Sequence, residues 1–140
     1  MHTLIVYGST LGNTERVADL IAQALGDQAQ TMNVTDVTTE DIAAATRILF
    51  GSSTWGDGEL QDDFEVFIDH FSEALLQGKE VAVFGCGDAQ SYPDEFCSAT
   101  DIIRERAESC GATIVAENLR VDGEPDDAEE DITAWAEALL

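Results

Sequence analysis

The sequence predicts an α/β protein in which helices cover both faces of a parallel β-sheet. Short apolar runs alternate along the 140 residues with longer segments whose apolar residues recur at helical spacing. This alternation favours parallel strands, because each helix returns the chain to the edge of the sheet where the next strand begins. Turns rich in glycine, serine and threonine follow several of the strands, and a parallel sheet binds its ligands at that edge.

Five runs are predicted as strands and five segments as helices. The predicted strands cover 3–8, 30–34, 47–53, 80–87 and 112–121. The predicted helices cover about 13–26, 39–45, 62–77, 96–110 and 126–139. The segment 62–77 shows which side of its helix is buried, because its large apolar residues fall on one stripe. We expect this stripe to belong to the core, and it consists of Phe64, Phe67, Phe71 and Leu75.

The composition is typical of one globular domain that spans residues 1–140. Hydrophobic residues make up 44% of the chain, and no repeat or linker divides it. We expect a cytoplasmic protein, because no apolar run is long enough to cross a bilayer and the first residues lack the features of a signal peptide. Cys86, Cys97 and Cys110 are too far apart for a Cys-x-x-Cys motif, so we interpret them as small buried apolar residues and predict no metal site.

The charge excludes some classes of partner. Six Lys and Arg residues stand against 29 Asp and Glu, for a formal net charge of −23. Nucleic acids and anionic membranes would be repelled, whereas basic proteins would be attracted. The acids are dense in 55–65 and 122–131. Three interpretations stay open: a solvated face, a docking surface, or adaptation to high salt.

The first polar turn, GSTLGNT at 8–14, resembles a phosphate loop without a lysine. Gly8 and Gly12 are three residues apart, and Asn13 stands where a nucleotide hydrolase needs lysine, so that class is excluded. A dinucleotide fingerprint is absent too. What remains is an anion cradle of backbone N–H groups at a helix start, with polar side chains beside it. The alternative is an ordinary helix cap. The side chains in question are Ser9, Thr10, Asn13 and Thr14.

The turns after the third and fourth strands each contain an aromatic residue in a polar setting. Trp55 lies in the turn 53–63, and Tyr92 lies in the turn 85–97. Either residue alone is more often a partly buried packing residue. Together, beside an anion cradle, they favour a planar ring held between two aromatic faces.

Four segments in this order resemble those of the flavodoxins, small electron carriers that contain FMN. They are STLGNTERVA, SSTWGDGELQDDF, FGCGDAQSYPDEFC and GATIV, and the resemblance covers essentially the whole chain. It implies a three-layer α/β/α sandwich whose five-stranded parallel sheet has the order 2-1-3-4-5. It also implies a low-potential one-electron carrier, not an enzyme, that works as a monomer and docks transiently with basic reductases and electron acceptors.

The resemblance also implies the residues of an FMN site. The phosphate would lie among Ser9, Thr10, Leu11, Gly12, Asn13 and Thr14. The ribityl chain would lie near Ser53 and Thr54, and the ring between Trp55 and Tyr92, with the peptide of Gly56 and Asp57 near N5. The pyrimidine edge would meet backbone groups of Asp88, Glu95 and Cys97, and the remaining contacts would be Cys86, Gly87 and Phe96. If the acidic charge is functional, we expect acids of 57–63 and 88–95 to crowd the flavin edge, whereas those of 126–130 would be distant and matter little.

The sequence departs from the family pattern in three places. Seven residues separate Asp88 from Phe96, as in long-chain flavodoxins, yet the last strand lacks the long-chain insertion. We therefore predict a short-chain flavodoxin with a long-chain-like outer loop. Leu11 replaces a residue that is usually polar or small, and the second loop is two residues shorter than in some short-chain members, which affects Asp57 and Gly58.

The same residues argue against two other classes of protein. A low-molecular-weight phosphatase needs an arginine six positions after its cysteine, but Cys86 is followed there by Tyr92. A phosphoacceptor domain needs a lysine on a later strand, but the single lysine, Lys79, precedes its strand. The alternative that stays open is a flavodoxin-like FMN-binding accessory or maturation protein that is not a general electron carrier.

Overall fold

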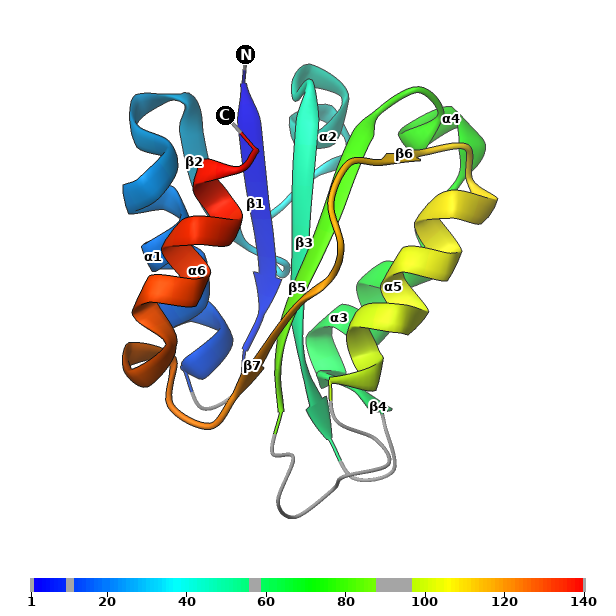
Figure 1. Cartoon of the computed structure of the whole chain (residues 1–140). Coiled ribbons are helices and arrows are strands. Elements are labelled where there is room, and N and C mark those ends of the chain that lie inside the picture. Colours follow the sequence, from blue (N-terminus) through cyan, green and yellow to red (C-terminus); the bar gives the residue numbers. More distant parts are fainter. Residues whose placement is uncertain (1, 10–11, 56–58, 88–96, 140) are drawn as a thin grey trace.

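The computed structural model describes residues 2–9, 12–55, 59–87 and 97–139, with the backbone alone for residues 54, 55 and 59. Its three layers confirm the predicted α/β class (Figure 1). One face of the sheet is covered by α1 (Asn13–Leu25) and α6 (Glu129–Glu137). The other face is covered by α2 (Thr39–Ala44), α3 (Asp62–Ile68), α4 (Glu73–Leu76) and α5 (Ser98–Ser109).

The parallel sheet has the order β2-β1-β3-β5-β6, and β7 also pairs with β5. Its strands are β1 (Thr3–Gly8), β2 (Ala29–Asn33), β3 (Arg47–Trp55), β5 (Glu80–Gly87), β6 (Thr113–Ile114) and β7 (Leu119–Asp122). This is the predicted order 2-1-3-4-5, but the continuous strand predicted at 112–121 is wrong. Val81 of β5 pairs with Ile114, and Phe84 of β5 pairs with Leu119. Between these pairs β5 advances three residues, whereas the edge segment advances five. The two extra residues cannot stay in register, so the edge strand divides.

Three short elements were not predicted. The strand β4 (Glu59–Leu60) pairs antiparallel with the end of β3. A 3₁₀ turn, η1 (Gly26–Gln28), follows α1, and another, η3 (Pro125–Ala128), precedes α6. The predicted helix 126–139 therefore begins as a 3₁₀ turn.

Alternation along the central strands divides the core between the two faces. In β1, Leu4 and Val6 belong to the core cluster that contains the buried residues of α3 and α5, whereas Ile5 belongs to the cluster that contains those of α1. In β3, Phe50 belongs to the same cluster as Leu4 and Val6, and Leu49 belongs to the same cluster as Ile5. Successive side chains of a strand point to opposite faces, so continuous apolar strands require helices on both.

The helix predicted at 62–77 is two helices. After α3 ends at Ile68, the Ser72 hydroxyl accepts a hydrogen bond from Leu75 N (3.2 Å) and caps α4. The predicted apolar stripe still packs in one cluster. Phe71 lies between the two helices, and the centroid of its ring is 4.9 Å from that of Phe50 on β3. Phe64 is fully buried, while Phe67, Phe71 and Leu75 are partly buried against the same core.

Lys79 fastens the end of α2 to the sheet. Its ammonium group donates to Ala43 O (2.8 Å) and Ala45 O (2.7 Å), carbonyls at the carboxyl end of the helix. We expect Lys79→Met to lower the unfolding free energy by about 1 to 2 kcal/mol, because it removes two charge-assisted hydrogen bonds and a favourable helix-dipole interaction. Urea denaturation measures the change.

A matched control removes the same unit of charge elsewhere. Arg104 pairs with Glu108 at 3.0 Å on an exposed turn of α5. Arg104→Gln should change stability by less than about 0.5 kcal/mol, because exposed pairs of this kind contribute little. Equal losses in the two variants would show that net charge alone, and not the contacts of Lys79, is responsible.

None of the helices in the described ranges is long and apolar enough to cross a membrane.

Candidate functional site

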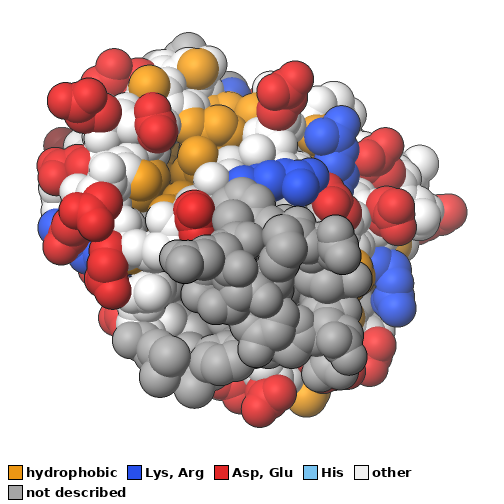
Figure 2. Space-filling view, turned by 60° about the horizontal axis from the view of Figure 1, so that its bottom comes forward, with side chains coloured by type: hydrophobic (Ala, Val, Ile, Leu, Met, Phe, Trp, Pro, Cys, Tyr) orange, Lys and Arg blue, Asp and Glu red, His pale blue; other side chains and the backbone are white. Residues whose placement is uncertain are grey.

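The carboxyl ends of β1, β3 and β5 meet at one edge of the sheet, at the bottom of Figure 1. Gly8 and Ser52 are register partners on β1 and β3, and Ser53 and Cys86 are partners on β3 and β5. The first polar turn, the end of β3 and the predicted contact Cys86 are therefore brought together, as the parallel arrangement predicts. Figure 2 turns this edge toward the viewer, and acidic side chains outnumber basic ones on the face that it shows.

The turn after β1 leaves the start of α1 open. Gly12 stands at the N-cap with φ of 94°, a left-handed conformation that favours glycine. No side chain in the described residues caps α1, and the Ser9 hydroxyl accepts instead from Gly12 N at 3.0 Å. The alternative of an ordinary helix cap is therefore not supported. Among the described residues no side chain occupies the first N–H groups of the helix, and these groups, with the positive end of the helix dipole, favour an anion.

The hydroxyl of Thr14 is buried at the same place without a conventional partner. Thr14 is 0% exposed, and its Oγ1 makes no hydrogen bond to any residue that the structure describes. Its polar neighbour is the thiol of Cys86, a weak partner. A buried hydroxyl without a full hydrogen bond is costly, so this atom indicates a partner that the described residues do not supply.

The two cysteines beside the sheet edge have raised pKa values, which favour the neutral thiol near neutral pH. Burial raises the pKa of the Cys86 thiol to about 11, against a smaller lowering by the Thr14 hydroxyl. Burial, and then the neighbouring Cys86, raise the pKa of Cys97 to about 12. The Cys97 thiol donates to Gly85 O and Val121 O, both at 3.7 Å. These contacts hold a residue whose φ of 54° is unusual for a side chain larger than glycine.

We expect the cysteines to react in a fixed order. Cys86 and Cys97 are buried and Cys110 is half-buried, so a thiol reagent at pH 8 should label Cys110 first in the folded protein. Mass spectrometry of the labelled peptides reads the order, and rapid labelling of Cys86 would contradict it.

The raised pKa of Cys86 predicts a dependence of stability on pH. The thiol of the unfolded chain ionises near pH 9, whereas that of the folded protein ionises near pH 11. The free energy of unfolding should therefore fall as pH rises from about 9 toward 11.

The end of β3 forms a hairpin with β4 that is fastened at its base. Thr54 is the register partner of Leu60 and Trp55 is that of Glu59, so the two strands pair antiparallel. At the base, Gln61 N donates to Ser52 Oγ (3.0 Å), and Ser52 Oγ donates to Ser53 O (2.9 Å). Gln61 is buried, with 2% of its surface exposed. Sequence reasoning missed it, although a glutamine just before an acidic helix start was a visible signal.

The structure places only part of the predicted site. Ser9, Gly12, Asn13, Thr14, Ser53, Cys86, Gly87 and Cys97 all lie at this edge. The side chains of Thr54 and Trp55 are outside the described residues. So are the predicted contacts Thr10, Leu11, Gly56, Asp57, Asp88, Tyr92, Glu95 and Phe96. In the described part of the chain, no cluster of three or more His, Cys, Asp or Glu side chains is arranged to hold a metal ion.

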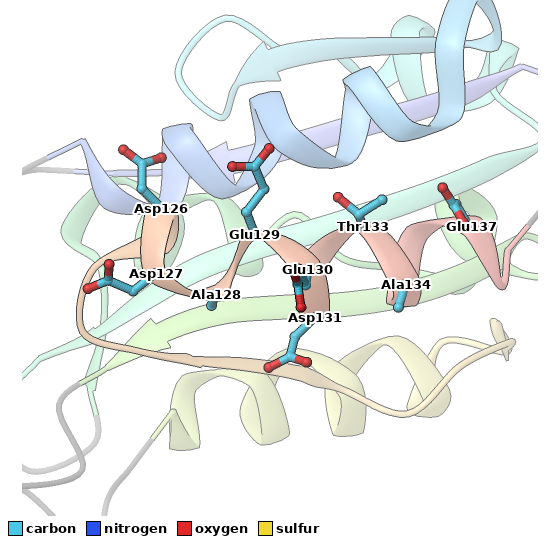
Figure 3. A pocket seen from close by; sticks show the side chains of 9 residues that line it. All are labelled: Asp126, Asp127, Ala128, Glu129, Glu130, Asp131, Thr133, Ala134 and Glu137. Atoms are coloured by element: carbon cyan, nitrogen blue, oxygen red, sulfur yellow. The ribbon is translucent and has the colours of Figure 1, made fainter.

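An acidic groove of about 700 Å³ lies over η3 and α6 (Figure 3). Its charged lining consists of Asp126, Asp127, Glu129, Glu130, Asp131 and Glu137. Asp126 points toward α1 and pairs with Arg16 at 2.8 Å. Asp126 therefore lies beside the first turn of α1, whereas the expectation that the acids of 126–130 lie far from the flavin stays a prediction.

Comparisons with known proteins agree with this architecture. The flavodoxin family model matches residues 5–135. A flavodoxin of Maridesulfovibrio salexigens is 43% identical over 144 aligned positions, which cover 98% of this chain and 95% of that protein. Oxidised flavodoxin 2 from Bacillus cereus is 37% identical with a TM-score of 0.86, over 99% of this chain and 94% of that one. A Fusobacterium nucleatum flavodoxin solved with flavin mononucleotide has the same fold, with 20% identity, a TM-score of 0.86, and coverage of 99% and 97%. The chain belongs to the flavodoxin family.

Proposed function

We propose that this flavodoxin binds one FMN non-covalently at the carboxyl edge of its sheet and carries single electrons between redox proteins. The family assignment supports the function, and one observation carries the site. The buried Thr14 hydroxyl has no conventional partner in the described residues, and it lies at the uncapped start of α1. When bound, FMN supplies one-electron chemistry that protein side chains lack.

The described donors fit a phosphate group without a cation. N–H groups at the start of α1 and the hydroxyl of Thr14 would donate to the phosphate. The nearest basic residue in sequence, Arg16, points instead to Asp126. The phosphate charge would therefore be balanced by hydrogen bonds and the helix dipole, and not by an ion pair. Ser53 and Thr54 of β3 would lie along the ribityl chain, and Trp55 would stack on the ring.

The thiols do not support a hydrolytic alternative. A cysteine-dependent phosphatase attacks with a thiolate, but burial raises the pKa of Cys86 to about 11, so the thiol stays protonated near neutral pH. This supports a carrier without a reaction of its own. No observation favours the accessory or maturation protein over the carrier.

The acidic surface supports basic partners. With a net charge of −23, electrostatic attraction would speed encounters with positively charged reductases and acceptors. We propose that the protein acts as a monomer with transient docking. The three cysteines are unpaired, as expected in the cytoplasm.

Titration of the apoprotein with three flavins tests the proposal. FMN should bind tightly with one molecule per chain. Riboflavin lacks the phosphate, so we expect it to bind at least about 100-fold more weakly. FAD should also bind weakly, because its adenine has no assigned pocket. Potentiometric reduction of the complex should proceed in two separate one-electron steps, the second at low potential because of the negative field. Failure of FMN to bind would overturn the proposal.

A further inference from the structure

Gln61 lies where the first two loops of the proposed site meet. Only 2% of the residue is exposed, and a buried side-chain amide needs hydrogen-bond partners. The FMN contacts implied by the family resemblance do not include it. Its contacts reach three different elements of the fold.

The backbone of Gln61 fixes the base of the hairpin. Its N–H donates to the fully buried Ser52 hydroxyl, which in turn donates to the carbonyl of Ser53. Ser53 is the last residue before the hairpin pairs Thr54 with Leu60. This chain of two hydrogen bonds sets the orientation of the peptide from which the hairpin leaves the sheet.

The side chain of Gln61 reaches α3 and β1. Its Oε1 accepts from Phe64 N (3.1 Å) and begins α3, while Nε2 donates to Asp63 Oδ2 (3.1 Å). The same Oε1 lies directly against Gly8 at the end of β1, so that a Cβ on Gly8 would collide with it. Gly8 is the register partner of Ser52. One residue therefore contacts both strand ends that lead into the proposed FMN loops.

We propose that Gln61 is a positioning residue for FMN, which holds the turn after β1 and the β3–β4 hairpin in one fixed relation. The inference rests on the proposed function, in which FMN contacts both segments. Where loops are already in their bound arrangement, binding does not have to order them, and the affinity is higher. Loss of the Gln61 side chain should therefore weaken FMN binding, although Gln61 is not among the predicted FMN contacts.

A cap alone does not require glutamine. Serine, threonine, aspartate and asparagine are the favoured N-cap residues, and each is short. The additional length of Gln61 is what brings its amide against Gly8 while it still caps α3. Replacement by a short capping residue therefore separates the two roles.

The test compares Gln61→Ser with wild type and with Ser72→Ala. Gln61→Ser keeps a cap for α3 but withdraws from Gly8. Ser72→Ala removes the cap of α4, which lies outside the sheet edge described above. We expect Gln61→Ser to raise the dissociation constant of FMN about tenfold and to change the visible circular dichroism of the bound flavin, with a near-normal urea midpoint of the apoprotein. Ser72→Ala should lower the urea midpoint and leave FMN binding unchanged.

A second pair of variants tests the contact with Gly8. Gly8→Ala should weaken FMN binding, because its methyl group displaces Gln61. Gly8→Ala with Gln61→Ser should bind FMN more tightly than Gly8→Ala alone, since the shorter residue leaves room. Wild-type affinity in Gln61→Ser, or additive losses in the double variant, would overturn the positioning role. Failure of the wild-type apoprotein to bind FMN would overturn the proposed function instead.

Discussion

Thr14→Val should change FMN affinity and apoprotein stability in opposite directions. Valine has nearly the shape of threonine, so packing is preserved while the buried hydroxyl is removed. FMN should bind about 10- to 100-fold more weakly, because a hydrogen bond to a charged phosphate is lost. The apoprotein should gain up to about 1 kcal/mol, because a buried hydroxyl without a conventional partner is no longer desolvated on folding. Fluorescence titration with FMN and urea denaturation of the apoprotein measure the two effects.

Thr100→Val is the matched control for stability. Thr100 is equally buried, but its hydroxyl donates to Cys97 O at 2.7 Å. The same substitution should therefore destabilise the apoprotein by about 1 kcal/mol, because a satisfied hydrogen bond is lost and a carbonyl loses its donor. Loss of stability in Thr14→Val as well would show that the Thr14 hydroxyl is already satisfied in the absence of ligand.

The three layers of the fold could be predicted, because a strand that is buried on both faces of the sheet has a continuous apolar sequence. Central strands contain uninterrupted apolar runs, at 48–50 and at 81–84, and such runs require a helix on each side of the sheet. The divided edge strand was not predictable in this way. Its cause is a two-residue mismatch in length against β5, and register depends on the partner strand and not on the local pattern.

The candidate site was predictable where backbone geometry and residue type carry the chemistry. The turn 8–14 indicated an anion cradle from its position between a strand and a helix. The role that we assign to Gln61 was not predictable from the sequence, because it depends on Gly8 of β1 and Ser52 of β3 being neighbours in the sheet. Such contacts arise from packing between segments about fifty residues apart, and the spacing of apolar residues within one segment does not predict them.

Salt should stabilise the apoprotein. Four ion pairs occur among the described residues, whereas the chain has 29 acids and six basic residues, so most acids face like charges. The Debye length falls from about 10 Å at 0.1 M salt to about 3 Å at 1 M, which screens this repulsion. We expect 1 M NaCl to raise the unfolding free energy by about 2 kcal/mol relative to 0.05 M, as measured with urea. A fall with added salt would mean that the ion pairs and helix dipoles outweigh the repulsion.

Two substitutions on α6 separate self-repulsion from the helix dipole. Glu130 lies in the first turn and Glu137 in the last, and both line the acidic groove (Figure 3). Glu137→Lys relieves repulsion and places a cation at the negative end of the dipole, so we expect a gain of about 1 kcal/mol at low salt. Glu130→Lys relieves the same repulsion but opposes the dipole, so the gain should be close to zero. The difference in stability between the two variants should shrink in 1 M NaCl, because salt screens interactions of exposed charges. Equal gains would assign the effect to net charge alone, and persistence at high salt would assign it to packing.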